Sequence, residues 1–139
     1  SRTAFMLNDY PGMPGHRGAP LFDAARFAAI CTAIDRRGLQ IAVHAVGDGS
    51  VRQTLDGFAA AQAANGVRDS RHRIEHIELI DRADIPRFAA LGVTASVQPT
   101  HAPGVMDFPV ATMAAVYPPA RWRDAHLART LADHGAHLA

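Results

Sequence analysis

Two kinds of hydrophobic pattern follow one another along this chain. From Leu21 to Arg37 the apolar residues recur at intervals of three and four, which indicates a helix with one apolar face. Gly38 comes directly afterwards and predicts a left-handed helix end. Residues 40–46 are mainly apolar and form a short run, as is typical of a buried strand. The first predicted unit is therefore a helix followed by a strand.

The same order of helix and strand continues to the last residue. The further predicted elements are a helix from 48 to about 65, a strand over 71–79, a short helix ending at Gly92, a strand over 93–97, a helix over 123–134 and the start of a strand at 137–139. Residues 1–20 are rich in Gly and Pro and predict a loop, and residues 102–121 are the least regular. Regular alternation predicts parallel strands with right-handed crossovers, an α/β fold.

Length and composition fit one folded domain. The chain has 139 residues, of which 48% are hydrophobic and 19% are charged. A complete (β/α)8 barrel usually needs about 250 residues, so only part of one fits into this length. We therefore expect one domain over residues 1–139, with a loop over 1–20 and alternating helices and strands over 21–139.

Charge and cysteine content limit the classes of partner and the cellular compartment that we expect. The net charge of +1 gives no footprint for nucleic acid or an anionic membrane, and no apolar run reaches the roughly 18 residues that a membrane span needs. The single cysteine, Cys31, excludes an intrachain disulfide and fits a reducing compartment, so we expect a cytoplasmic protein. Whether a longer precursor carries a cleaved signal stays open. All basic residues are arginines, so Schiff-base or carbamylated-lysine chemistry would need a lysine from elsewhere.

Two histidines lie near the ends of consecutive predicted strands, His44 on the first and His76 on the second. In barrels of alternating strands and helices, the active site is built at the C-terminal strand ends. Neutral imidazole is also the commonest protein ligand for zinc and related metals. The pair therefore predicts part of a metal site. Two histidines without a compact motif fit hydrogen-bonded core residues equally well, and the spacing leaves both interpretations open.

Three runs in order resemble a known family: His-Ala-Val-Gly-Asp at 44–48, Arg-His-Arg-Ile-Glu-His at 71–76 and Gly-Val-Thr-Ala-Ser-Val-Gln-Pro-Thr-His at 92–101. They resemble the metal-dependent amidohydrolase superfamily, and more closely its family-3 branch, which includes N-substituted formamide deformylase. The resemblance covers nearly the whole chain. It implies a partial (β/α)8 TIM-type barrel, roughly strands five to eight, with His44 and His76 as the metal ligands of strands five and six.

The same resemblance shows which family residues have no counterpart here. Family members carry a His-x-His pair on the first strand, often a bridging lysine on the fourth and a proton-shuttling aspartate on the eighth. None of these can be placed in this sequence, so the catalytic residue stays unknown. We therefore expect a C-terminal half-barrel fragment that is inactive alone.

The implied activity is hydrolysis of a C–N bond in a small molecule, such as an amide, formamide or cyclic amide, by metal-activated water. The complete enzyme would hold one or two divalent ions, with zinc favoured. The other interpretation is a non-catalytic half-barrel that serves as an assembly or interaction module. Because a half-barrel exposes its sheet edges and inner face, we expect a homo-oligomer. Its inner face would be lined by one alternating set of residues, either Ile41, Val43, Ile74 and Val93 or their neighbours.

Two further residues are candidates near this site. Glu78 shares the alternating face of His76 and could orient a ligand from outside the coordination sphere. His101 follows the third strand, where it contacts substrate or lies in an exposed loop.

Simple structural roles are expected for other polar residues. Asp48 follows a glycine before a helix, which favours an N-cap over a catalytic acid. Glu75 alternates away from His76, so we expect an ion pair with Arg71 or Arg73 on the helix-facing side. The remaining histidines are assigned to the surface or to packing, and they are His16, His126, His134 and His137.

Overall fold

The computed structural model describes residues 2–105 and 109–139. Its helices and strands are α1 (Ala24–Asp35), β1 (Ala42–Ala45), α2 (Asp48–Asn65), β2 (Arg73–His76), α3 (Ile85–Leu91), β3 (Thr94–Ser96), α4 (Val110–Val116), α5 (Ala128–Asp133) and β4 (His137–Leu138). Three short 3-10 turns lie between them: η1 (Arg82–Asp84), η2 (Pro99–His101) and η3 (Pro119–Asp124). This order confirms the predicted alternation of helices and strands.

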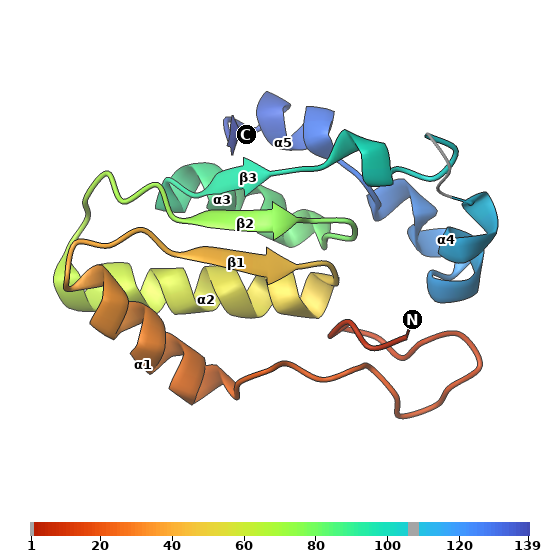
Figure 1. Cartoon of the computed structure of the whole chain (residues 1–139), viewed down its shortest axis with the longest axis horizontal. Helices are drawn as coiled ribbons and strands as arrows, with labels where there is room; N and C mark the ends of the chain where they lie inside the picture. The colour runs from red at the N-terminus through yellow and green to blue at the C-terminus, as the bar shows by residue number, and fades with distance from the viewer. Residues whose placement is uncertain (1, 106–108) are drawn as a thin grey trace.

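The four strands form one parallel sheet in the order β1-β2-β3-β4 (Figure 1). Each strand therefore pairs with the next strand along the chain, as short right-handed crossovers through helices require. Val43 lies opposite Ile74, and Ile74 lies opposite Ala95. The α/β class and the partial barrel-like arrangement of parallel strands are confirmed.

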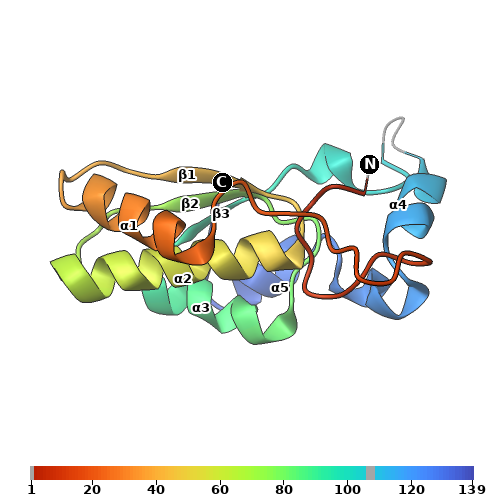
Figure 2. The same ribbon diagram turned by 90° about the horizontal axis from the view of Figure 1, so that it is seen from below.

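Helices α1, α2, α3 and α5 all lie on one face of the sheet (Figure 2). Ile41, Val43, Ile74 and Val93 pack against these helices in the main hydrophobic core. The alternate residues therefore face the other way, onto what we call the open face, which no helix covers in the described part of the chain. His44, Glu75 and Ser96 share one row of the strand register on this open face.

For Glu75, the structure confirms the predicted ion pair but not the predicted face of the sheet. Its carboxylate lies 2.7 Å from the Arg73 guanidinium, so the ion pair with Arg73 forms, while Arg71 pairs instead with Asp69. The expected side of the sheet was wrong. Ile74, between the two partners, points into the helix-side core, so strand alternation places the Arg73–Glu75 pair on the open face.

The predicted helix over 123–134 is also shorter than expected. Chain pairing explains its missing first part, because Ala125 forms an antiparallel bridge with Leu79 and the His126 N–H donates to the Glu78 carbonyl at 2.9 Å. Only residues 128–133 form an α-helix, residues 123–124 belong to η3, and α4 lies within the stretch predicted to be irregular. Gly38 and Gly92 adopt the left-handed conformations expected at helix ends, with φ of 74° and 65°. Within the described ranges, no helix combines the length and apolarity that a bilayer crossing demands.

His72, which directly precedes β2, has a structural role. The His72 Nδ1 accepts a hydrogen bond from the Ile41 N–H at 3.1 Å, and its Nε2 lies 3.1 Å from the Asp35 carboxylate. This pattern fixes the neutral tautomer, with the proton on Nε2. Burial lowers the pKa of His72, although Asp35 acts in the opposite direction. His72 thus joins α1 to the start of the sheet as an uncharged group.

We predict that this buried imidazole makes the protein sensitive to mild acid. Because the folded state holds the pKa of His72 below 6.5, the unfolded chain binds more protons as the pH falls through that value, and folding stability decreases. One such group contributes a slope of up to about 1.4 kcal/mol per pH unit. Urea unfolding between about pH 7 and 5 should therefore show a shallower loss in His72→Gln than in the parent. His134→Gln, at an exposed histidine, should keep the parent's slope.

Candidate functional site

His44 and His76 converge at the C-terminal ends of β1 and β2. The His44 Nδ1 lies 2.7 Å from the His76 Nε2, and the two ring centroids are 4.9 Å apart. The expected meeting of these side chains at adjacent strand ends is therefore present in the structure. A separation of 2.7 Å is that of a hydrogen bond, somewhat shorter than the roughly 3.4 Å between two nitrogens bound to one tetrahedral zinc ion.

The two imidazoles meet only because the backbone turns at His76. The register pairs Ala45 with His76 and His44 with Glu75, so continued alternation would place the two rings on opposite faces. Instead, His76 and Ile77 both adopt left-handed conformations, with φ of 76° and 52°. Such conformations cost about 1–3 kcal/mol each in residues other than glycine. The simple face-sharing argument used for His76 and Glu78 was therefore insufficient, since the strand ends at this turn.

Glu78 and His101 lie beside His76. The His101 Nδ1 is 3.3 Å from a Glu78 carboxylate oxygen, and the His101 ring stacks on that of His76 at 5.6 Å between centroids and 14° between planes. Ligand-type atoms of His76, Glu78 and His101 all lie within 4.8 Å of one another. We call His44, His76, Glu78 and His101 the histidine cluster. It joins the ends of β1, β2 and β3.

Within the histidine cluster, the electrostatics favour the neutral form of His76. Burial lowers the pKa of His76 first, and the neighbouring His44 adds to the effect. The His76 Nδ1 is also buried and has no hydrogen-bond partner among the described residues. Neutral histidines with one carboxylate form a donor set that suits zinc and similar divalent ions. The residues present therefore fit a metal ion.

A pocket of about 470 Å³ adjoins the histidine cluster. His44 and Glu78 border it, and most of the other lining residues are apolar or aromatic. These wall residues include Phe5, Tyr10, Leu21, Met113, Val116 and Tyr117. The volume falls within the range of small-molecule sites. No arginine lines the pocket among the described residues, although the chain contains 14.

His126 also lines this pocket, and the sequence prediction of a surface or packing role missed it. Its backbone has a φ of 52°, its N–H donates to the Glu78 carbonyl, and burial lowers its pKa. The helix predicted over 123–134 gave no indication of this position, because residue 126 lies before the observed helix α5. Only the pairing of the distant segments at Leu79 and Ala125 brings it to the site.

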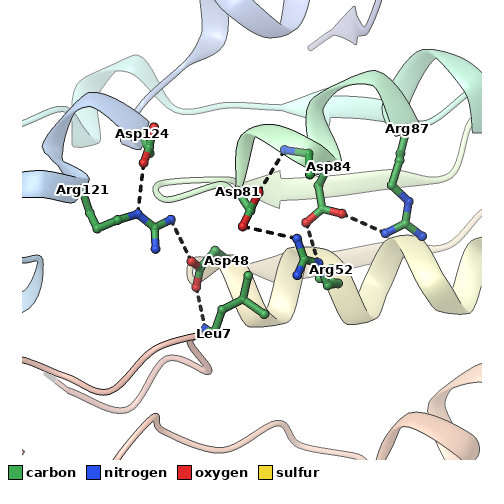
Figure 3. A network of polar contacts seen from close by, with 9 residues as sticks. Leu7, Asp48, Arg52, Asp81, Asp84, Arg87, Arg121 and Asp124 are labelled. Carbon is green, nitrogen blue, oxygen red and sulfur yellow. Dashed lines mark hydrogen bonds and ion pairs between the residues drawn. The ribbon is translucent and has the colours of Figure 1, made fainter.

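Asp48 links segments that lie near the pocket through a network of polar contacts (Figure 3). Its fully buried carboxylate accepts a hydrogen bond from the Leu7 N–H at 2.8 Å and pairs with Arg121 at 2.9 Å. Arg121 pairs in turn with Asp124 at 3.0 Å. The N-cap prediction for Asp48 was wrong, because Gly47 holds that position and Asp48 is the first helical residue. Its carboxylate is used for long-range contacts between the N-terminal loop, α2 and η3.

Close backbone packing explains the glycine before Asp48. The carbonyl of Phe5 lies so near Gly47 that an added Cβ would collide with it. The same carbonyl accepts a hydrogen bond from the Ser50 N–H at 3.2 Å. The loop that brings Phe5 and Tyr10 to the pocket is thus fixed on the turn that follows His44.

The fold and the site define a partial α/β barrel of the hydrolase type, with candidate ligands at its strand ends. A family profile described as an amidohydrolase family matches residues 1–139. The chain therefore belongs to the amidohydrolase family.

Individual relatives agree with this assignment. The chain is 38% identical over 101 residues to the protein LONG AFTER FAR-RED 3 of Arabidopsis thaliana, which covers 73% of this chain and 17% of that protein. It is 27% identical over 108 residues to the putative amidohydrolase YtcJ of Bacillus subtilis, covering 78% of this chain and 20% of that protein. This chain thus spans a fifth or less of the length of these curated relatives.

Solved structures show the same fold. The chain is similar to an uncharacterized metal-dependent hydrolase from Pyrococcus furiosus, with a TM-score of 0.79 and 25% identity, covering 99% of this chain and 27% of that one. A second metal-dependent hydrolase, from Pyrococcus horikoshii, has a TM-score of 0.79 and 24% identity, covering 99% and 26%. Nearly every residue of this chain therefore has a structural counterpart in about a quarter of each hydrolase.

We predict that Asp48→Ala destabilises the protein by about 3 kcal/mol, because removing one partner of a buried ion pair is costly. The substitution also removes the acceptor for the Leu7 N–H. Denaturant unfolding measures the change. Asp133→Ala is the matched control, since its pair with Arg129 is exposed and should contribute less than about 1 kcal/mol. Equal effects of the two substitutions would contradict the proposed importance of the buried link.

Proposed function

We propose that this chain provides part of the metal-binding centre of a hydrolase that cleaves a C–N bond in a small molecule. The convergence of His44 and His76 from adjacent parallel strands carries this proposal. Membership of the amidohydrolase family and the similarity to metal-dependent hydrolases support it. The motif resemblance further favours an amide, formamide or cyclic amide substrate and the branch that includes N-substituted formamide deformylase.

His44 and His76 are the proposed ligands, and one or two divalent ions would be held by the complete protein. Zinc is favoured by the imidazole-rich donor set. Such an ion supplies a water of lowered pKa and polarises the carbonyl of the substrate. Burial within the chain favours the neutral form of His76, and aromatic and aliphatic side chains contribute many of the walls of the adjoining pocket.

The pocket indicates how a substrate would be oriented. Its aromatic and aliphatic walls suit an uncharged substituent, while His44 and Glu78 border the end where the reacting group would lie. His126 lines the same space and can hydrogen-bond a polar atom of the substrate. We propose that hydrolysis requires further residues, including the proton-shuttling carboxylate that the family resemblance implies, so the 139-residue chain alone would be inactive. The buried thiol of Cys31, whose pKa is raised to about 11 by burial, fits the proposed cytoplasmic location.

We predict that His44→Ala and His76→Ala, made in the protein at its full encoded length, each remove hydrolysis and reduce bound metal together. The loss of activity should exceed the roughly 10–100-fold effect typical of residues outside the coordination sphere. Amide hydrolysis and metal content by mass spectrometry provide the two measurements. His134→Ala controls for the loss of an exposed histidine. Full activity with unchanged metal in His76→Ala would contradict the assignment.

A non-catalytic assembly role is the alternative, and the open face of the sheet supports it. The end strands β1 and β4 each have one unpaired edge within the described ranges, and exposed edges favour association. The open face itself is polar where His44, Arg73 and Glu75 lie. Polar and charged contacts would therefore contribute to any interface formed there.

We predict that the 139-residue chain forms a homodimer or larger assembly through this open face. Sedimentation velocity over a range of protein concentrations would measure its mass. Arg73→Glu should weaken the assembly, because it places two acids together at Arg73 and Glu75. A folded monomer at every concentration would contradict the prediction.

A further inference from the structure

We propose that the phenol O–H of Tyr117 donates a hydrogen bond to an oxygen atom of the molecule that occupies the pocket of about 470 Å³. This inference deepens the proposed function and rests on it for the identity of that molecule as a substrate. The occupant is a small molecule that carries an uncharged acceptor oxygen, such as a carbonyl, on an aromatic or aliphatic framework. Tyr117 is thus a substrate-binding residue that the sequence analysis did not single out.

The hydroxyl group of Tyr117 has no hydrogen-bond partner among the described residues, because the hydrogen bonds of this residue are made by its backbone. The residue is only 5% exposed, and it lines the pocket together with Glu78. Buried polar side chains in folded proteins are nearly always paired, so an unpaired phenol beside a pocket needs a partner from outside the chain. An acceptor atom on the occupant provides that partner.

The other tyrosine of the chain shows what a structural phenol does in the same place. Tyr10 lines the same pocket, and its O–H donates to the Ala4 carbonyl at 2.7 Å, which holds the N-terminal loop in place. Tyr117 packs in the same hydrophobic cluster as Tyr10 and Leu79, but its hydroxyl makes no such bond. Ring packing therefore explains an aromatic residue at position 117 and leaves its oxygen unexplained, since phenylalanine would fill the same space.

Electrostatics keep the Tyr117 phenol in its protonated form. Burial raises the pKa of Tyr117, and the nearby Glu78 carboxylate acts in the same direction. The phenol therefore carries its proton at neutral pH and can act as a donor. Glu78 would repel a negatively charged group on the occupant, and no arginine among the described lining residues offsets this repulsion. The arrangement thus favours an uncharged acceptor oxygen over a carboxylate.

The backbone on both sides of Tyr117 fixes the position of the donor. Tyr117 ends α4 in an extended conformation, with φ of −113° and ψ of 133°, as the following Pro118 favours. Its N–H donates to the Met113 carbonyl at 2.8 Å, and its carbonyl accepts from the Trp122 Nε1 at 3.0 Å. A donor on an anchored backbone with a packed ring loses little freedom when a ligand binds.

The test is a ligand-observed NMR titration of the full-length protein with two matched probes. Acetophenone carries a carbonyl oxygen, and ethylbenzene has the same carbon framework without it. The parent should bind acetophenone more tightly than ethylbenzene, and Tyr117→Phe should reduce this preference about fivefold, as the loss of one neutral hydrogen bond does. Tyr10→Phe is the matched control. It removes a hydroxyl that is already paired within the chain, so the preference for acetophenone should remain.

Urea unfolding separates a ligand-binding hydroxyl from a structural one. Tyr117→Phe should leave the unfolding midpoint unchanged or raise it, because an unpaired and mostly buried hydroxyl contributes no stability. Tyr10→Phe should lower the midpoint, because it removes the donor to the Ala4 carbonyl. A lower midpoint for Tyr117→Phe would assign its hydroxyl a structural role and overturn the inference.

The outcomes also separate this inference from the proposed function. If the parent hydrolyses amides and Tyr117→Phe keeps the parent's preference for acetophenone, the role of Tyr117 is wrong and the proposed function stands. If Tyr117→Phe loses this preference but the parent hydrolyses no amide, the binding role stands and the proposed function fails. A folded parent that binds the two probes equally, or binds neither, overturns the inference.

Discussion

The left-handed backbone at His76 and Ile77 is the constraint on which the candidate site depends. It ends β2 and turns the His76 ring toward His44, against the alternation that the strand register would impose. The unfavourable conformation is maintained because the Ile77 side chain is buried in the main core and its N–H donates to the Ala45 carbonyl at 3.1 Å. Packing of Ile77 in the core thus offsets the free-energy cost of the left-handed backbone at the site.

A second constraint fixes what surrounds the histidine cluster. Asp48 lies only four residues after His44, and its carboxylate joins the N-terminal loop to Arg121 at the other end of the chain. The N-terminal loop lines the pocket, and so do Tyr117 and His126, which flank the η3 turn that carries Arg121. A single buried carboxylate therefore couples the strand that presents His44 to the loops that shape the adjoining space. This explains why a glycine precedes it, since the loop must approach the turn closely.

The sequence predicts the order and direction of the strands well, because helix and strand periods and the glycine stops are local signals. His44 and His76 could be placed at strand ends for the same reason. The details that depend on contacts between distant segments could not be read in this way. The Asp48–Arg121 pair, the bridge between Leu79 and Ala125, and the resulting place of His126 join residues far apart in the chain. The face of Glu75 was misjudged because His76 was treated as part of a regular strand.

The distribution of charge connects the fold with the proposed chemistry. Arginines hold the buried acids on the helix side and at the loop contacts, and they leave the pocket walls free of positive charge. The histidine cluster instead combines imidazoles with Glu78, while burial favours the neutral form of His76. A protonated imidazole could balance the carboxylate, but this burial opposes further positive charge on His76. His76 is therefore held in the neutral form in which histidine binds a divalent ion, as the proposed metal centre requires.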